Sequence, residues 1–517
     1  MTSSSSMKTV VFGAGILFFN SIFMFLFRFV YRIVSSRALG PETYGLVVLG
    51  ETILNILVLV SLLGLNQALS RFLPELMQEG KFARVRGILA VSFVSSLVLS
   101  GILGLLLYLF SDMISVGIFG NSNLSFVLFF MALALPFYVG IMILTKTFIA
   151  LRKPKESAII TTFLRNGGQL LLVLLLLLVG FSLRAYLWIY VISSAIAFLI
   201  GFWMLYKYLR MKIGISRHVE MDFKRTFSYA IPLFMTGFFV QMMGYIDMSL
   251  LGIFLPESYV GVYSVSISLA TSFWIFLTSF SYIFFPVVSG LLAKGDYSHS
   301  RELYLVISRW IFTLSVPFAF GLILFAPQIL TLLFGEAYAT GYAALIILVM
   351  GYFFNVITGP ASDVLKALGR VKFIFWFNVL MAGINLILNI LLIPKYFLVG
   401  AAVSTTFTLF LKEFVIFLVA KKELQMSFNW KKYLPSLFAV LFSFGLAFGF
   451  SLTFPIFFES FFVLIVLALG FCIYGFLLFL FRAFYKEDLQ VVDLLLERFK
   501  IRDPKWRAMF LRFVRNN

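Results

Sequence analysis

Four basic side chains lie inside long apolar stretches of the sequence: Arg28, Arg32, Arg165 and Lys412. A charge in a hydrocarbon environment is costly, so its presence indicates a functional group by default. Arg28 and Arg32 are four residues apart and therefore share one helix face. Guanidinium groups bind phosphate through paired N–H donors, so this face suits an anionic, phosphate-bearing ligand. The structural alternative is that both side chains reach the outer headgroups.

Arg165 begins a second polar face, with Asn166 and Gln169 close behind it. A basic group near the inner half of an apolar helix suits a phosphate that enters from the cytoplasm. We therefore predict Arg165, Asn166 and Lys412 as further substrate-binding residues. For Arg165 the alternative is again an interfacial side chain. Lys412 is adjacent to Glu413, so we expect these two side chains to point in different directions.

Glu51 and Asp247 are the deep carboxylates that we predict for ion coupling. Glu51 lies about 10 Å from the outer end of its helix, by the helical rise per residue. Two interpretations stay open for it. It is either a proton or sodium site, or a partner for Arg28 or Arg32.

The composition excludes several classes of protein. The chain has 517 residues, of which 62% are hydrophobic and 12% charged, and its mean hydropathy is +1.04. Soluble globular proteins carry about 25% charged residues. Lipid must therefore be the solvent for much of this surface, which excludes a soluble enzyme, a nucleic-acid-binding protein and a disordered chain.

Cofactor chemistry has little support in the sequence. Cys472 is the single cysteine, and the two histidines, His218 and His299, lie far apart in polar loops, so we expect no metal site. A Walker A motif is absent, because Gly80-Lys81 lacks the upstream glycine and the following Ser or Thr. We expect no cofactor, and transport driven by an ion gradient or by the gradient of the substrate.

Apolar runs long enough to cross a bilayer recur along the chain. They predict an all-α membrane protein with fourteen transmembrane helices, at 10–34, 44–66, 85–110, 125–150, 158–180, 185–206, 228–254, 259–285, 303–325, 340–359, 371–393, 397–420, 433–453 and 460–484. Lysine and arginine gather in alternate loops, whereas the opposite loops show only Arg37, Arg184 and Lys395. By the positive-inside rule both termini are cytoplasmic, in a plasma membrane.

An internal repeat relates the two halves of the sequence. Pro256 lies 215 residues after Pro41, and Gly261 lies 216 residues after Gly45. Prolines at 74 and 286 and basic turns at 153 and 370 follow at similar offsets. Four matches in order at one offset indicate a structural repeat.

The offset spans six predicted helices, an even number, so both copies share one orientation. This predicts an N-lobe (10–209) and a C-lobe (228–420) related by a pseudo-twofold axis along the membrane normal, with a cavity between them. The pair at 433–484 is an addition to the two lobes.

Asp247 and Arg32 each lie nine residues before the repeated proline. They either face each other across the cavity or form a structural ion pair. Paired lobes are typical of alternating access.

The segment 485–517 has a different pattern. Leu489, Val492, Leu496 and Phe499 recur at helical spacing among basic residues. We expect an amphipathic cytoplasmic tail on the anionic leaflet, with a frayed basic tail as the alternative.

Several motifs resemble one known family. They are residues 37–45 (Arg-Ala-Leu-Gly-Pro-Glu-Thr-Tyr-Gly), 64–75 (from Gly-Leu-Asn-Gln to Leu-Pro-Glu), 230–233 (Ala-Ile-Pro-Leu), Phe334-Gly335 with Tyr338, and 400–405 (Gly-Ala-Ala-Val-Ser-Thr). In this order they resemble the polysaccharide-type flippases for lipid-linked oligosaccharides, within the multidrug/oligosaccharidyl-lipid/polysaccharide exporter superfamily. The resemblance covers roughly residues 10 to 484.

The resemblance implies a two-lobed transporter that moves a polyprenyl-phosphate- or pyrophosphate-linked glycan to the outer leaflet. It implies that Arg28 and Arg32 engage the anionic head group, and that glycan biosynthesis enzymes are partners. In related peptidoglycan-precursor flippases, an extra helix pair like 433–484 forms a hydrophobic groove for the lipid tail. Drug-exporting relatives usually have twelve spans and acidic cavities.

Three alternatives stay open. A cation or drug antiporter driven by H⁺ or Na⁺ would depend on Asp247. A membrane glycosyltransferase or polymerase needs a catalytic carboxylate at a membrane surface, but Glu42, Glu257 and Glu336 lie in short outer turns. A non-transporting assembly partner would tolerate loss of every intramembrane charge.

Overall fold

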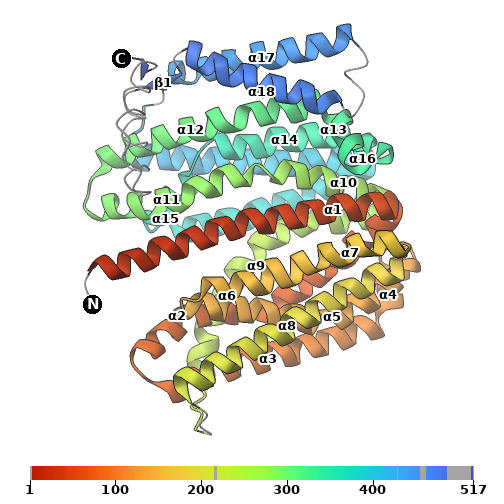
Figure 1. The fold of residues 1–517 in the computed structure, drawn as a ribbon, viewed down its shortest axis with the longest axis vertical. Helices are drawn as coiled ribbons and strands as arrows, with labels where there is room; N and C mark the ends of the chain where they lie inside the picture. The colour runs from red at the N-terminus through yellow and green to blue at the C-terminus, as the bar shows by residue number, and fades with distance from the viewer. Residues whose placement is uncertain are drawn as a thin grey trace. The chain divides into compact units, whose positions relative to one another are not determined.

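The structure is a computed structural model that describes residues 3–214, 218–427, 429–454, 462–481, 483–485 and 514–515. Within these residues it is almost entirely helical (Figure 1). Eleven helices are long and apolar enough to cross a membrane, or twelve if the bent pair Phe223–Phe239 and Gly244–Phe254 is one span. The chain is therefore a multi-pass membrane protein.

Two compact units divide the chain, Met1–Ser264 and Val265–Asn517. The helices of the first are α1 (Ser3–Leu62), α2 (Leu65–Gln78), α3 (Phe82–Leu109), α4 (Ser111–Gly117), α5 (Asn123–Ala150), α6 (Pro154–Ala158), the π-helix η1 (Ile159–Gly167), α7 (Gly168–Val179), α8 (Leu183–Ile213) and α9 (Phe223–Phe254). Helix α10 (Glu257–Thr271) crosses the boundary. The predicted lobe limits at 209 and 228 remain a prediction.

The second unit holds α11 (Trp274–Ala293), α12 (Tyr297–Leu324), α13 (Ala326–Phe334), η2 (Glu336–Gly341), α14 (Tyr342–Ile357), α15 (Ala361–Ala367), α16 (Val371–Glu423), η3 (Trp430–Lys432), α17 (Leu434–Thr453) and α18 (Phe462–Leu480). The short strands β1 (Phe484–Tyr485) and β2 (Val514–Arg515) pair in parallel. The predicted amphipathic helices of the tail lie outside the described residues.

Helices α1 and α16 each contain a residue with non-helical backbone angles. Gly40 has φ 72° and ψ 168°, directly before Pro41. Phe397 has φ 52° and ψ −128°, three residues after Pro394. A residue with positive φ and a nearby proline interrupt the helical hydrogen bonds, so each helix consists of two segments.

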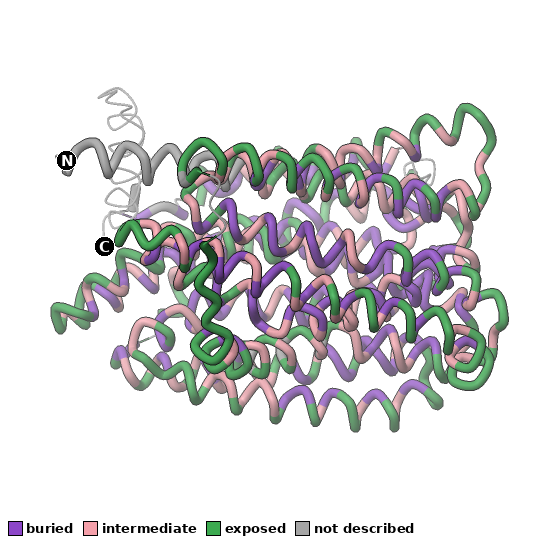
Figure 2. Tube along the Cα trace, turned by 90° about the horizontal axis from the view of Figure 1, so that it is seen from below, coloured by how far each residue is buried: buried purple, intermediate pink, exposed green. Residues whose placement is uncertain are grey.

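Within the first unit α5 is the central helix. It packs against α1, α2, α3 and α8, as the side-by-side ribbons of α3, α5 and α8 in Figure 1 show. Its leucines, isoleucines and valines are buried along most of its length. Other helices keep apolar side chains exposed, such as Leu178 at 83% and Val179 at 88%. Figure 2 shows this mixture of buried and exposed positions along the helices, which fits a lipid-facing exterior.

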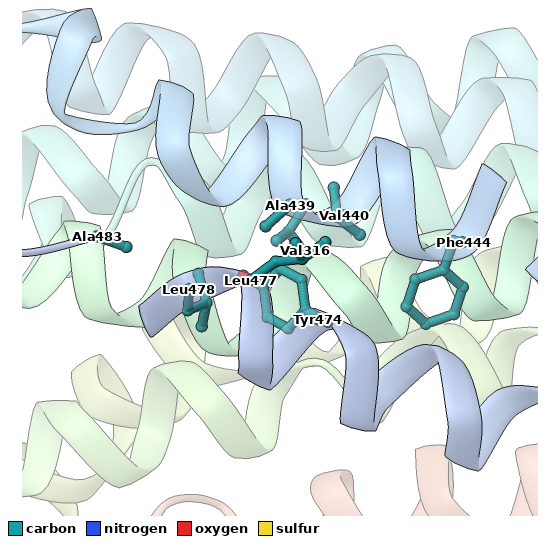
Figure 3. Close-up of a cluster of buried hydrophobic side chains, with 8 residues drawn as sticks. All are labelled: Val316, Ala439, Val440, Phe444, Tyr474, Leu477, Leu478 and Ala483. Atoms are coloured by element: carbon teal, nitrogen blue, oxygen red, sulfur yellow. The ribbon is translucent and has the colours of Figure 1, made fainter. Parts of the chain in front are cut away.

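Helices α17 and α18 lie side by side and pack against α12 in the second unit. Their shared core contains Val316 of α12 between Val440 and Phe444 of α17 and Tyr474 of α18 (Figure 3). The Tyr474 hydroxyl donates to the backbone oxygen of Thr313, at 2.8 Å. The added pair is thus attached to the second unit by both apolar packing and hydrogen bonds.

Candidate functional site

The middle of α1 carries the predicted arginines. Arg32 Nη1 donates to the backbone oxygen of Ser264 at 3.3 Å, and the Tyr44 hydroxyl is in hydrogen-bonding range of both residues. Arg28, one turn earlier, is exposed within the chain. One guanidinium is therefore partly engaged by the protein, whereas the other is open to a ligand.

Glu51 lies among three cations. Its carboxyl group interacts electrostatically with Arg32 most strongly, then with Arg28 and Arg165. Within the described part of the chain it makes no direct ion pair. The structure thus brings together four of the predicted residues. Three of these four residues carry guanidinium groups, so the surroundings of Glu51 are rich in positive charge.

A group of tyrosines surrounds these charges. The Arg165 guanidinium lies over the Tyr138 ring, 3.8 Å from its centroid, and 6.0 Å from that of Tyr190. Tyr31 stacks on Tyr186 with ring centroids 5.9 Å apart, and their hydroxyls lie 2.7 Å apart. Cation–π contact holds an arginine in place without neutralising it, so the positive charge stays available.

The sequence analysis missed these tyrosines, because 22 tyrosines offered no basis for choosing among them. One signal was present. Tyr186 and Tyr190 stand four residues apart on α8, which places both on one face of an otherwise apolar helix.

Asp247 is buried in α9 and accepts a hydrogen bond from the Tyr263 hydroxyl, at 3.0 Å. Tyr263 precedes Ser264, the acceptor of the Arg32 bond. Two successive residues of α10 thus contact Asp247 and Arg32, the two charges that the predicted repeat would place at equivalent positions.

Lys412 and Glu413 belong to the second unit and pair with each other, with Nζ and Oε1 3.1 Å apart. The expectation that these adjacent side chains diverge is wrong, because both are long enough to fold toward each other beside the helix. Nearby, the Asn389 Nδ2 donates to Asn385 Oδ1 at 3.1 Å, and Asn385 Nδ2 donates to Thr405 at 3.4 Å. The polar groups of this unit therefore bond largely among themselves.

An apolar groove of about 810 Å³ lies along α17. Its lining residues are Lys431, Leu434, Pro435, Phe438, Leu441, Phe442 and Phe481. Lys431 belongs to η3, directly before α17. An apolar channel with a basic end fits a lipid that carries an anionic head.

No cluster of His, Cys, Asp or Glu that could hold a metal ion occurs in the described ranges.

Comparisons with known proteins give two family models and several relatives for this chain. A family model described as polysaccharide biosynthesis protein matches residues 10–292, and the MatE model matches residues 232–391. The probable low-salt glycan biosynthesis flippase Agl15 of Haloferax volcanii is 24% identical over 398 residues, 76% of this chain and 78% of the relative. The capsular polysaccharide biosynthesis protein CapF of Staphylococcus aureus is 27% identical over 43% of this chain and 56% of its own.

Two solved structures share the fold. The lipid II flippase MurJ, in an inward-closed conformation, superposes with a TM-score of 0.71 at 15% identity, over 91% of this chain and 98% of its own. An inward-facing multidrug resistance MATE family transporter of the MOP superfamily has a TM-score of 0.65 at 15% identity, over 77% and 94%.

Proposed function

This chain belongs to the polysaccharide biosynthesis protein family, and from that premise we propose that it is a flippase for a lipid-linked oligosaccharide. It moves a polyprenyl-phosphate- or polyprenyl-diphosphate-linked glycan from the cytoplasmic to the outer leaflet by alternating access. The observation that carries this proposal is the basic cluster of Arg28, Arg32 and Arg165 around the single carboxylate of Glu51. An excess of fixed positive charge inside a membrane protein needs an anion, and a phosphate head group supplies one.

The helix breaks support the proposed count of fourteen spans. Twelve spans, with α1 and α16 each divided at its non-helical residue, become fourteen. Both termini then lie on the same side, which the distribution of lysine and arginine makes the cytoplasm.

The contact between Gly45 and Gly261 supports a two-lobed repeat. A Cβ atom at Gly45 would meet the backbone oxygen of Glu257, and one at Gly261 would meet that of Pro41. Positions 41 and 257 are 216 residues apart, as are positions 45 and 261. A reciprocal contact of this kind is typical of elements related by a twofold axis, so we assign six helices to each lobe.

The groove along α17 is the proposed place of the polyprenyl chain. Its apolar walls suit the isoprenoid. Relatives named as flippases for glycan biosynthesis support this reading. The enzymes that assemble the glycan are the proposed partners.

For ion coupling we propose Glu51 and Asp247, the deep carboxylates of the first unit. Proton or sodium binding at Glu51 would change the charge of the cluster by one unit, and so its affinity for phosphate. A second candidate function, a cation antiporter, has one observation in its favour, because the MatE match includes Asp247. The positive excess around Glu51 favours the flippase.

The test is translocation in proteoliposomes. A fluorescent polyprenyl-diphosphate oligosaccharide is placed in the inner leaflet, and its exposure to an added enzyme outside is followed over time. We expect the wild type to flip it and Arg28→Ala/Arg32→Ala to lose the activity. Cation-driven dye efflux without flipping, dependent on Asp247, would replace the flippase by the antiporter.

A further inference from the structure

The π-helix η1 carries Arg165 near its end and passes into α7 at Gly168. A π-helical turn is rare in proteins and occurs frequently at functional sites. Gln169 follows Arg165 by four residues, so both side chains lie on one face. This face adjoins the basic cluster described above, because Arg165 interacts with Glu51.

Both side chains present a hydrogen-bond donor that has no acceptor. The Nε of Arg165 and the Nε2 of Gln169 are buried and lack a partner among the described residues. Gln169 is only 5% exposed. A buried donor without an acceptor is costly to keep, so a structure that retains two of them on one face indicates an acceptor supplied from outside the chain.

The chemistry of the two donors narrows the class of ligand. Neither the guanidinium nor the amide nitrogen accepts a hydrogen bond, so the ligand atom must be an acceptor. Arg165 keeps its positive charge and is held over the Tyr138 ring at 3.8 Å. A fixed guanidinium next to an amide N–H matches a charged oxygen, such as a phosphate oxygen, better than a neutral hydroxyl.

We propose that Arg165 and Gln169 form a phosphate-oxygen subsite, in which Gln169 determines specificity for the anionic head group. This inference rests on the proposed function. It adds an uncharged residue that donates a hydrogen bond to the phosphate. A free phosphate and a lipid head group present the same oxygen chemistry, so the experiment has an arm for each.

The test measures binding of farnesyl diphosphate and of inorganic pyrophosphate to the purified full-length protein by calorimetry, together with thermal unfolding. Gln169→Leu keeps the volume of the side chain and removes the donor. We expect it to weaken farnesyl diphosphate binding about tenfold or more. Its thermal stability should be unchanged or higher, because an unpaired donor has gone. Gln169→Glu should weaken farnesyl diphosphate binding further, since the new carboxylate would pair with Arg165 and repel the phosphate.

Gln328→Leu is the matched control. Its buried amide is also unpartnered, but the unpaired atom is the acceptor Oε1, so anion binding should be unchanged. Equal weakening for both probes assigns the subsite to phosphate itself, and weakening for farnesyl diphosphate alone assigns it to the lipid head group.

Wild-type affinity in Gln169→Leu overturns the subsite and leaves the flippase intact. Weaker binding accompanied by a lowered unfolding temperature overturns it as well, since that pattern shows a structural glutamine. If the wild type binds neither probe and flips no lipid, the proposed function fails together with the subsite.

Discussion

Two groups of intramembrane charges, one in each compact unit, differ in how they are paired. In the first, Arg28, Arg32 and Arg165 share the single carboxylate of Glu51, with no direct ion pair to it in the described residues. In the second, Lys412 and Glu413 pair at 3.1 Å. A paired lysine has its counter-charge within the fold, whereas the arginines of the first unit keep a positive excess.

This difference separates a structural charge from a functional one. A pair that is neutral overall can be replaced by neutral residues at little cost, because desolvation offsets most of its attraction. A cluster with excess positive charge lowers the stability of the empty protein, and we propose that an anionic substrate compensates it. The sequence analysis grouped Lys412 with the arginines, and the structure separates them.

The largest effect we predict is on transport. Arg28→Gln/Arg32→Gln should lower the flipping rate at least about a hundredfold, because two charge-assisted bonds to phosphate are lost, each worth about 1.5–3 kcal/mol. The matched control is Lys412→Gln/Glu413→Gln, which removes the same number of charges and keeps the net charge. Its rate should stay within about threefold of wild type. Equal losses in the two variants would erase the distinction between the units.

The second prediction concerns stability. Lys412→Met leaves the Glu413 carboxylate, which is 5% exposed, without its cation, and should destabilise the protein by about 3 kcal/mol. The double change Lys412→Met/Glu413→Gln should restore most of that loss. Thermal unfolding in detergent measures both. A double variant that is less stable than Lys412→Met would show that the stability contributions of the two side chains do not depend on each other.

The sequence predicted the helical membrane fold because apolar runs of span length need no tertiary information. The predicted runs at 85–110, 125–150 and 433–453 agree closely with α3, α5 and α17. The π-helix η1 was not predictable, since its residues show the same apolar pattern as an α-helix. The non-glycine turn at Phe397 was missed for a similar reason, because Pro394 indicates a break but does not locate the left-handed residue.

At the candidate site, sequence reasoning found the charges but not what surrounds them. Arg28, Arg32 and Arg165 stand out because arginine is rare in an apolar run. The stacking of Arg165 on Tyr138 joins different helices, and the pairing of Lys412 with its neighbour depends on side-chain rotamers. Spacing along one chain contains neither kind of information.

The third prediction tests the reciprocal contact between the segments around Gly45 and Gly261, which both lie in the first unit. Gly45→Ala and Gly261→Ala should each destabilise by about 2 kcal/mol, since the new Cβ atom would clash with the backbone oxygen of Glu257 or Pro41. A repeat-related contact requires that both substitutions lower the stability by similar amounts. Gly101→Ala is the control, because open space surrounds that position within α3. A large loss from one glycine and none from the other would contradict a reciprocal contact.

The smallest effect concerns charges outside the membrane, at the start of α3. Arg84 Nε donates to Glu220 Oε2 at 3.0 Å, His218 lies 3.4 Å from the other carboxylate oxygen, and the Glu220 N–H donates to the Ala83 oxygen at 3.2 Å. The hydrogen bond from Arg84, with a further contribution from His218, lowers the pKa of the Glu220 carboxyl from its ordinary value. These residues join the segment before α9 to the start of α3.

A carboxylate whose pKa is lower in the folded state stabilises that state above its unfolded pKa of about 4.3. This contribution is lost as the pH falls through the lower, folded pKa. The unfolding temperature of wild type should therefore exceed that of Glu220→Gln slightly at pH 6, and the difference should vanish as the pH falls toward 3. Both partners are about half exposed, so about 0.5 M salt should remove most of the difference. A difference that persists at low pH and in salt would mean that the Glu220 backbone bond to Ala83, and not its charge, holds this segment in place.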